Sequence, residues 1–425
     1  MILIKGGRIL DPAQNMDTVA DIIIDEGKIT AIGVNLSADG AEIINATGMY
    51  VAPGLIDMHV HLREPGYEAK ETIATGTKAA VKGGFTAVAC MPNTKPTADS
   101  AAIISAIVEK AKYTASCRVY PIGAITKGQK SEELAEMGDM AEAGAVAFSD
   151  DGTSVITAEL MRLALLYTQG FQRPVLAHCE DASLAEGGQM HYGYHSTLFG
   201  LQGIPAIAEE IVIARDIALA EATGGRLHIC HVSTAGGVAL IRAAKAKGIN
   251  VTAEVTPHHL TLTAEMLSTY NTAFKVNPPL RTEEDIIALK EALVDGTIDC
   301  IATDHAPHAE EEKAVEFASA PFGMVGLETA LPLMWETLVV GNVLTPLALI
   351  GKMSTNPARI LSIPGGNLKV GAAADITIID PSLEEVLDRQ SLQSIGKNTP
   401  YHGRTLTCLA DTVLVAGEIK YKAER

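Results

Sequence analysis

Residues 50–63 read YVAPGLIDMHVHLR, an apolar run that predicts a β-strand and closes with the pair His59 and His61. Alternate residues of a strand share one face, so both imidazoles can point at a common centre. Two imidazoles delivered together from the end of a strand suit a divalent metal ion. A His-x-His pair alone is a weak signal, because two histidines two residues apart often occur by chance.

The pattern of an apolar run followed by a polar side chain recurs along the middle of the chain. Strand candidates alternate there with Ala-rich amphipathic stretches, which include residues 70–82, 101–112, 132–143, 209–222 and 236–247. The strand candidates end near His61, Pro92, Ile125, Asp151, His178, His231, Pro257 and Asp304. This alternation predicts an α/β fold, a (β/α)8 TIM-like barrel, whose active site lies at the C-terminal ends of its strands.

The two ends of the chain share a different pattern. Residues 2–4, 21–25 and 28–32 are β-rich runs broken by Gly and Asp, and residues 371–380 and 412–417 have the same character. We therefore expect a small β-sandwich built from both termini. The expected domains are residues 1–51 with 365–425 for the sandwich and residues 52–364 for the barrel.

Composition limits the classes of partner. The chain has 425 residues, of which 47% are hydrophobic, and this predicts an ordinary globular protein with a large core. Its 33 Lys and Arg against 51 Asp and Glu give a net charge of −18, which repels nucleic acid and anionic membrane surfaces. A small anionic substrate is compatible with this charge if the site carries its own cations.

The cysteines and the N-terminus indicate a compartment. Six scattered cysteines without a Cys-x-x-Cys pair argue against a disulfide framework or a cysteine zinc site. The N-terminal run MILIKGG is not typical of a signal peptide, and no apolar run reaches the ~18 residues of a membrane helix. We expect a cytoplasmic protein.

Six side chains at the predicted strand ends form a candidate metal site. Imidazole and carboxylate ligands without thiolates suit a catalytic zinc ion, which lowers the pKa of bound water toward ~7. Asp304 could both bind the metal and carry a proton. The candidate ligands are His59, His61, Asp151, His178, His231 and Asp304.

The alternative interpretation of each of these residues is a buried, hydrogen-bonded histidine or a cap. For one residue alone that alternative is preferable, but it explains poorly why ligand-type residues stand at five strand ends together. The segment around Asp151 could be only a turn. His228, at odd spacing from His231, is expected to face the other way as a packing residue. We expect His258 and His259 to be structural or to lie behind the ligands.

Longer motifs resemble a known family. These motifs are HVHLREPG (59–66), MPNT (91–94), KVNPPLR (275–281), TDHAPH (303–308) and PFGMVGLET (321–329). Together with the histidine pattern they resemble the amidohydrolase superfamily and, within it, the long, type I class of bacterial dihydroorotases. The resemblance covers nearly the whole chain, including the β-sandwich built from two termini.

The resemblance implies a reaction and a cofactor. The reaction is the reversible cyclisation of N-carbamoyl-L-aspartate to L-dihydroorotate with loss of water, the third step of pyrimidine (UMP) synthesis. One or two Zn²⁺ ions per subunit would bind, with Asp151 as the bridging ligand where many relatives carry a carboxylated lysine. Asp304 would take the proton from the attacking hydroxide and deliver it to the leaving nitrogen.

The resemblance also implies substrate contacts. Arg63 would hold the free carboxylate of the substrate in a bidentate pair, and Asn93 would add a hydrogen bond. The alternatives are a surface charge for Arg63 and a turn residue for Asn93. The expected contacts are His61, Arg63, Asn93, Asn277, His308, Phe322 and Gly323.

Two other functions stay open from the sequence. Another cyclic amidase, such as a hydantoinase or an allantoinase, usually resembles the lysine-bridged pattern that is missing here. A non-catalytic dihydroorotase-like partner of aspartate transcarbamoylase should have lost ligands. The resemblance makes aspartate transcarbamoylase a candidate partner beside the small-molecule substrate, and we expect a homo-oligomer.

Residues 309–320 join two parts of the expected site. Their length and charge are typical of a lid over a barrel mouth. The run of three glutamates is almost equally typical of a short solvated helix. Both interpretations stay open.

Overall fold

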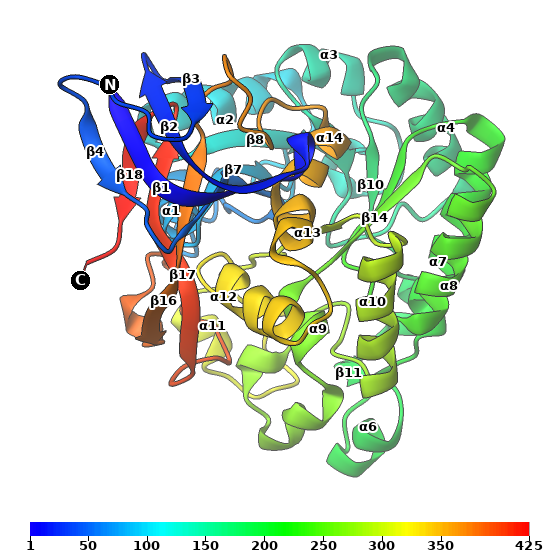
Figure 1. The fold of residues 1–425 in the computed structure, drawn as a ribbon. Helices are drawn as coiled ribbons and strands as arrows, with labels where there is room; N and C mark the ends of the chain where they lie inside the picture. The colour runs from blue at the N-terminus through cyan, green and yellow to red at the C-terminus, as the bar shows by residue number, and fades with distance from the viewer. Residues whose placement is uncertain (425) are drawn as a thin grey trace.

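The middle of the chain forms a barrel of eight parallel strands (Figure 1) in this computed structural model, which describes residues 1–424. The strands are β6 (Leu55–Val60), β7 (Phe85–Cys90), β8 (Arg118–Gly123), β9 (Ala147–Ser149), β10 (Val175–Ala177), β13 (Leu227–Ile229), β14 (Val251–Val255) and β15 (Cys300–Ile301). The backbone N–H of His61 donates to the carbonyl of His305 at 2.8 Å, which joins the first strand to the last. The predicted barrel is confirmed, and each strand ends within a few residues of its predicted end.

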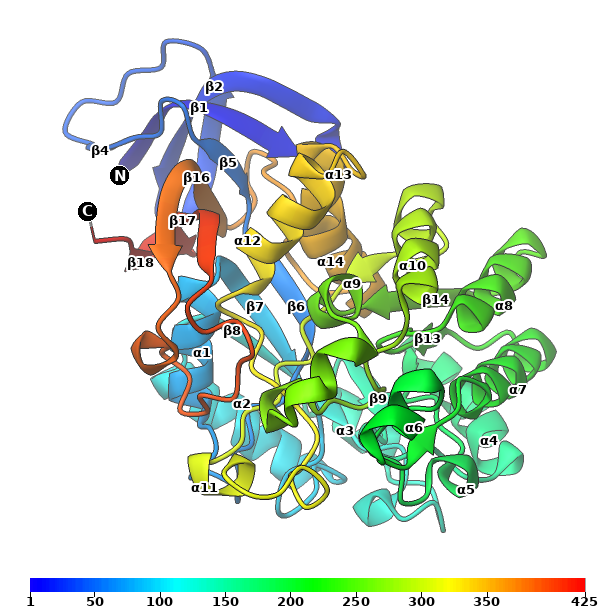
Figure 2. The same cartoon turned by 90° about the horizontal axis from the view of Figure 1, so that it is seen from below.

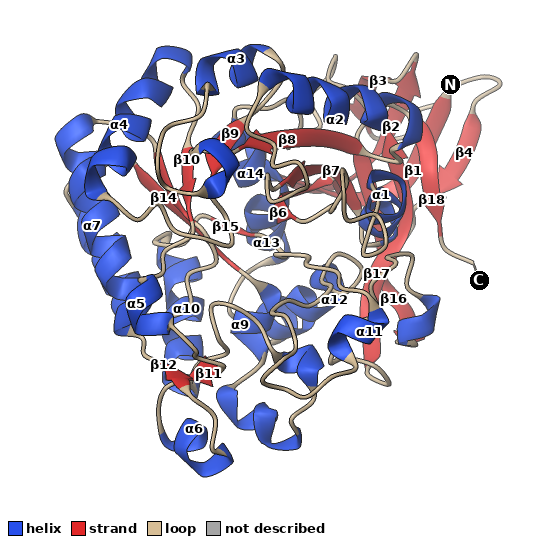
Figure 3. Ribbon diagram, turned by 180° about the vertical axis from the view of Figure 1, so that it is seen from behind, coloured by secondary structure: helices blue, strands red, loops and turns tan. Residues whose placement is uncertain are grey.

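Helices surround the strands, as Figure 3 shows with the helices in blue and the strands in red. The longer helices are α1 (Ile73–Lys82), α2 (Ala101–Thr114), α4 (Ala158–Thr168), α7 (Ile207–Thr223), α8 (Ala235–Ala246) and α10 (Glu283–Asp295). Shorter ones are α3 (Met137–Glu142), α5 (Ala182–Ala185), α6 (Tyr194–Phe199), α9 (Pro257–Thr261), α11 (Glu310–Lys313), α12 (Ala330–Met334), α13 (Pro346–Ile350) and α14 (Asn356–Leu361). The five helical stretches read from the sequence correspond to α1, α2, α3, α7 and α8.

Smaller elements complete the connections. The 3-10 helices are η1 (Pro12–Gln14), η2 (Lys127–Gln129), η3 (Gln169–Phe171), η4 (Ala264–Thr269), η5 (Thr272–Phe274) and η8 (Arg389–Ser391). Two π-helices are η6 (Trp335–Val340) and η7 (Gly351–Thr355), and β11 (Met190–His191) pairs with β12 (Gly203–Ile204).

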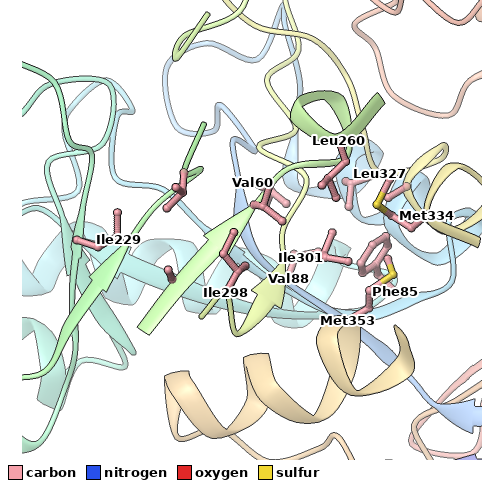
Figure 4. Packing of buried hydrophobic residues seen from close by; sticks show 14 of the residues in the cluster. Val60, Phe85, Val88, Ile229, Leu260, Ile298, Ile301, Leu327, Met334 and Met353 are labelled. Carbon is pink, nitrogen blue, oxygen red and sulfur yellow. The ribbon is translucent and has the colours of Figure 1, made fainter. Parts of the chain in front are cut away.

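Local sequence explains why these elements form. Strands β6 and β7 are buried throughout, as expected for parallel strands covered on both faces. Thr72 caps the start of helix α1, and its side chain accepts from the backbone N–H of Thr75 in a capping box. Between barrel and helices, one cluster contains Val60, Ile301 and Met334 (Figure 4). This packing fixes the strand ends on which the site depends.

Both termini contribute to one eight-stranded mixed sheet, which lies beside the barrel (Figure 2). Its strands are β1 (Ile2–Asp11), β2 (Met16–Asp25), β3 (Lys28–Gly33), β4 (Glu42–Asn45), β5 (Tyr50–Pro53), β16 (Ile376–Val386), β17 (Thr405–Val415) and β18 (Glu418–Lys422). Strand β5 joins the two halves, because it pairs with β1 on one side and β16 on the other. Its core mixes both ends of the chain, including Ile4, Ile22, Val51, Ile376 and Leu414. The expected union of the termini is confirmed.

The cysteines and the helices test two expectations from the sequence, which concern disulfide bonds and membrane helices. All six cysteines are buried and free of disulfide bonds, as the sequence predicted. Among residues 1–424, none of the helices combines the length and apolar character that crossing a membrane requires.

Candidate active site

His59 and His61, from the end of β6, meet two carboxylates at the C-terminal end of the barrel. His59 Nε2 lies 3.3 Å from Asp151 Oδ1 and 3.5 Å from Asp304 Oδ1. His61 Nε2 lies 2.9 Å from Asp304 Oδ1 and 3.5 Å from Asp151 Oδ2. Four ligand-type groups from three strand ends therefore face one another.

The other two predicted ligands approach Asp151 from β10 and β13. His178 Nδ1 lies 3.6 Å and His231 Nε2 lies 3.5 Å from Asp151 Oδ1, and the two ring nitrogens are 3.0 Å apart. Atoms that share a tetrahedral zinc ion at about 2.0–2.1 Å stand roughly 3.3 Å apart, so these spacings match shared coordination. Asp151 belongs to both groups, one with His59 and His61 and one with His178 and His231.

Unpaired polar atoms test whether a metal ion fits here. His59 Nε2 and Asp151 Oδ1 are buried and have no hydrogen-bond partner. A buried polar atom without a partner is costly, and a cation among these atoms would satisfy both. The donor set contains imidazole and carboxylate groups only, which suits zinc. The residues present therefore fit a divalent metal ion.

The carboxylates of the cluster are held in their charged form. Burial alone would raise the pKa of Asp304, but the hydrogen bond from His61 and the charges of the neighbouring imidazoles lower this pKa to about 2. Burial also opposes ionisation of Asp151, yet the charge of His59 and the neighbouring imidazoles of His178 and His231 bring its pKa well below the usual range. Both side chains can therefore act as anionic ligands at neutral pH.

Three site residues have left-handed backbone conformations. The φ angles are 61° at Arg63, 32° at His231 and 49° at Asp304. Such conformations cost on the order of 1–3 kcal/mol each outside glycine and often occur at functional sites. At His231 the chain has already left β13, so strand alternation does not relate this residue to His228. His228 instead lies under the site, with Nε2 3.2 Å from Glu254 Oε2.

A cavity of about 200 Å³ opens above the cluster. His59 lies beneath it with no exposed surface. Every predicted substrate contact lines this cavity, together with five of the six predicted ligands. The lining residues are His61, Arg63, Asn93, Asp151, Gly152, His178, His231, Asn277, Asp304, Ala306, His308, Phe322 and Gly323.

Arg63 gives the cavity a cation. Its Nε–H donates to the carbonyl of Pro307 at 3.2 Å, and within residues 1–424 no carboxylate forms an ion pair with it. Burial lowers the pKa of Arg63 while the charges of Asp304 and Asp151 raise it. A guanidinium remains charged under these conditions. Arg63 is therefore available to an anionic group that enters the cavity.

Some of the polar groups around Arg63 already form hydrogen bonds within the protein. Asn93 Oδ1 lies 2.9 Å from His61 Nδ1, so this amide holds the ring with Nε2 facing the cluster. His308 Nε2 donates to the carbonyl of Phe322 at 2.8 Å, and burial lowers the pKa of His308 to about 3. His308 Nδ1 and Asn277 Oδ1 are buried without a hydrogen-bond partner, and His308 Nδ1 lies 3.4 Å from Glu312 Oε2. Asn277 Oδ1 is therefore available to a ligand in the cavity.

Two residues at the site carry no clear mark in the sequence. Glu254 in β14 places Oε1 2.6 Å from His59 Nδ1, and its only signal is one acid within an apolar strand. Asn398 accepts from the backbone N–H of His308 at 3.1 Å and donates to the carbonyls of Ala306 and Gly323 at 3.0 Å. No local pattern relates Asn398 to a site 90 residues away.

The segment 309–320 contains a short helix with solvent-exposed glutamates. Helix α11 covers only Glu310–Lys313, and Glu310 and Glu311 are exposed. Lys313 is buried, and its ammonium donates to the carbonyls of Thr272 at 3.1 Å and Pro321 at 2.7 Å. The segment is thus tied down at this lysine, and its motion remains a prediction.

The fold and the site define a class of protein. A (β/α)8 barrel with clustered imidazoles and carboxylates at the C-terminal ends of its strands, attached to a sheet from both termini, is the architecture of an amidohydrolase. The sequence model of the family described as "Dihydro-orotase-like" matches residues 48–236. The chain is 59% identical over 418 residues to the dihydroorotase of Pelotomaculum thermopropionicum, covering 98% of each chain. It is 52% identical over 424 residues to that of Geotalea daltonii, covering 100% of each. The chain belongs to the dihydroorotase family, and it is a cyclic amide hydrolase.

Solved structures place the same fold in neighbouring amidases. The L-hydantoinase (dihydropyrimidinase) from Arthrobacter aurescens superimposes with a TM-score of 0.89 at 26% identity, covering 99% of this chain and 96% of that one. The D-hydantoinase from Bacillus sp. AR9 gives 0.87 at 26% identity, covering 99% and 95%. The fold is therefore shared with hydantoinases, while the sequence follows dihydroorotases.

Proposed function

We propose that the chain uses one or two zinc ions to interconvert N-carbamoyl-L-aspartate and L-dihydroorotate, the third step of pyrimidine synthesis, in the cytoplasm. The observation that carries this proposal is one cavity with two features. Imidazole and carboxylate side chains that could bind a metal line its floor, and the guanidinium of Arg63, which forms no ion pair within residues 1–424, lies in its wall. A cyclic amide with a carboxylate substituent matches both features.

The proposed ligands are His59, His61, Asp151, His178, His231 and Asp304, with Asp151 between the two groups. When bound, zinc supplies a Lewis acid and lowers the pKa of water toward ~7, so that hydroxide is available at neutral pH. The metal content of the purified protein distinguishes one tightly bound ion from two.

The chain's own residues orient the substrate and move the proton. Arg63 binds the free carboxylate through its planar fork, and Asn277 and the backbone of Gly323 contact the amide edges of the ring. In the hydrolytic direction the oxygen of water attacks the ring amide carbon, and the bond from that carbon to the ring nitrogen breaks. A carboxylate oxygen of Asp304 accepts the proton of the water and delivers it to the leaving nitrogen. The reverse sequence closes the ring and releases water.

A hydantoinase activity is the second candidate, because the solved structures of similar fold include hydantoinases. Two features of this chain argue against it. Asp151 stands where the resemblance places a bridging lysine in those enzymes, and Arg63 supplies a carboxylate-binding group that hydantoin does not need. Aspartate transcarbamoylase as a partner and a homo-oligomeric state remain proposals that rest on the family resemblance.

One experiment tests the proposal directly. Purified protein is assayed with dihydroorotate, hydantoin and allantoin, and its zinc content is measured on the same sample. His178→Ala and His231→Ala should lose zinc and turnover together, whereas His402→Ala, which removes an exposed histidine, should lose neither. Full zinc occupancy with normal turnover in both cluster variants would sink the metal assignment. Faster turnover of hydantoin than of dihydroorotate would favour the second candidate.

A further inference from the structure

A hydrogen-bonded chain of side chains runs through the barrel interior beneath the proposed metal site. Thr252 Oγ1 lies 2.8 Å from His228 Nδ1, and His228 Nε2 lies 3.2 Å from Glu254 Oε2. The other oxygen, Glu254 Oε1, lies 2.6 Å from His59 Nδ1. His59, His228 and Glu254 have no exposed surface at all. The chain ends on a proposed ligand, although none of its other members lines the cavity.

The position of each proton follows from the contacts. If His59 offers the lone pair of Nε2 to a metal ion, its proton must be on Nδ1, and this N–H donates to Glu254 Oε1. An ionised carboxylate only accepts hydrogen bonds, so Glu254 Oε2 takes a second bond from the Nε2–H of His228. His228 Nδ1 then accepts from the hydroxyl of Thr252. Every donor in the chain points toward Glu254.

We propose that Glu254 is a positioning residue of the metal site. It holds the His59 ring with Nε2 facing Asp151, and it keeps the proton of His59 on Nδ1. It also makes the His59 imidazole a stronger ligand, because a carboxylate that accepts the distal N–H raises the basicity of the ring. His228 and Thr252 act on Glu254 rather than on the metal, since they fix its second oxygen. The inference rests on the proposed role of His59 as a ligand.

Burial explains why this arrangement needs both imidazoles. A carboxylate without exposed surface is costly unless its oxygens are paired. Glu254 also accepts a longer hydrogen bond, 3.4 Å, from the backbone N–H of His231, so it contacts the backbone of one proposed ligand and the side chain of another. A substitution of Glu254 should therefore alter metal binding more than it alters the cavity wall.

The test uses Glu254→Gln, which keeps the shape but removes the charge. Metal-free protein is titrated with zinc in competition with a chromophoric chelator. Loss of a hydrogen-bond partner behind a metal ligand typically lowers metal affinity by about 10–100-fold, and we expect a loss in this range. The matched control is Glu71→Gln, a fully buried carboxylate 3.5 Å from Nε2 of His305, which is not a proposed ligand. The control should bind zinc as the wild type does.

A spectroscopic readout separates positioning from general destabilisation. The visible absorption of the cobalt-substituted protein reports the ligand field, so it should shift in Glu254→Gln and stay unchanged in Glu71→Gln. If Glu254→Gln does not fold, Thr252→Val replaces the hydroxyl at the outer end of the hydrogen-bonded chain by a methyl group of similar size. It should lower zinc affinity in the same direction by a smaller factor.

The outcomes distinguish this inference from the proposed metal site itself. If wild-type protein binds no zinc, or His178→Ala binds it normally, the proposed function fails. If wild-type protein binds zinc, His178→Ala loses it and both Glu254→Gln and Thr252→Val bind zinc as tightly as wild type, only the role of Glu254 is overturned. Equal losses of affinity in the Glu254 and Glu71 variants would also overturn it, since any buried carboxylate would then have the same effect.

Discussion

At the scale of single residues, the carboxylate of Asp304 lies between the histidine cluster and the cavity. It faces His59 and His61 of the cluster and also borders the cavity in which a substrate would lie. Asp304 follows β15 by three residues and has a left-handed backbone, with φ of 49°. Such a position suits a group that both binds a metal and moves a proton.

Replacing Asp304 by Asn should separate these two roles. The amide keeps the size and some ligand capacity but cannot accept a proton from water. Turnover of dihydroorotate should fall by at least the ~100-fold typical of lost general acid–base catalysis, while zinc remains bound. Steady-state kinetics and zinc analysis of one preparation check this. Near-normal turnover in Asp304→Asn would show that another group carries the proton.

Arg63 should determine selectivity for the carboxylate. Lysine at this position keeps the charge but loses the planar fork that binds a carboxylate through two hydrogen bonds. The ratio of kcat/KM for dihydroorotate to that for dihydrouracil, the same ring without the carboxylate, should drop by roughly tenfold or more. A tenfold drop corresponds to a loss of about 1.4 kcal/mol of transition-state stabilisation from the carboxylate contact. An unchanged ratio in Arg63→Lys would remove Arg63 from the substrate site.

At the scale of elements, the segment 309–320 connects two parts of the cavity lining, His308 before it and Phe322 after it. Lys313 holds it to Thr272 and Pro321, and Glu312 forms an ion pair with Lys70 at 2.7 Å. Helix α11 has only four residues, too few to be stable without such contacts. Further along the segment, the ammonium of Lys275 donates to the carbonyls of Phe317 at 2.8 Å and Ala318 at 3.0 Å.

Hydrogen exchange should detect a response of this segment to a ligand. Amides in residues 309–320 should exchange more slowly when dihydroorotate or an unreactive analogue saturates the site, because the segment would order over the barrel mouth. Exchange in α10 (Glu283–Asp295), away from the cavity lining, provides the internal reference. The same rate in 309–320 with and without ligand would favour a solvated helix without a role in closure.

At the scale of the whole molecule, the sheet from the two termini contributes to the barrel mouth. The loop between β16 and β17 carries Asn398, which binds the backbone at His308, Ala306 and Gly323. Three backbone groups of the cavity wall are therefore held by a residue from the last part of the chain. The terminal unit thus shapes the candidate substrate site as well as covering one side of the barrel.

Asn398→Ala should weaken substrate binding more than it slows the chemical step. The cavity wall contacts the substrate before and during the reaction, so KM should rise by roughly tenfold while kcat changes little, about the effect of one or two lost hydrogen bonds. Gln393→Ala, an exposed position in the same loop, is the control and should keep the wild-type KM. A fall in kcat at constant KM would place Asn398 in the chemistry instead.

Much of the architecture could be predicted from local patterns. Apolar runs such as the one before His59 and His61 gave each barrel strand within a few residues, because strand and helix periodicities are short-range properties. The same runs end in ligand-type residues, and a barrel brings the C-terminal ends of all its strands to one face. The six candidate ligands could therefore be named before any distance was known.

Contacts between distant segments could be decided only by the tertiary structure. Glu254 lies 195 residues from His59, and Asn398 lies 90 residues from His308. His228 reaches Glu254 because it pairs with Thr252 in β14, and Glu254 lies two residues further along the same face of that strand. Strand β13 ends at Ile229, so the alternation rule that related His228 to His231 no longer applied. The amino-acid sequence alone thus determined the barrel, the two-ended sheet and the residue types at the strand ends. Which side chains support those residues depended on how the barrel closes, since a hydrogen bond across it is set by three-dimensional distance and leaves no periodic signal in the chain.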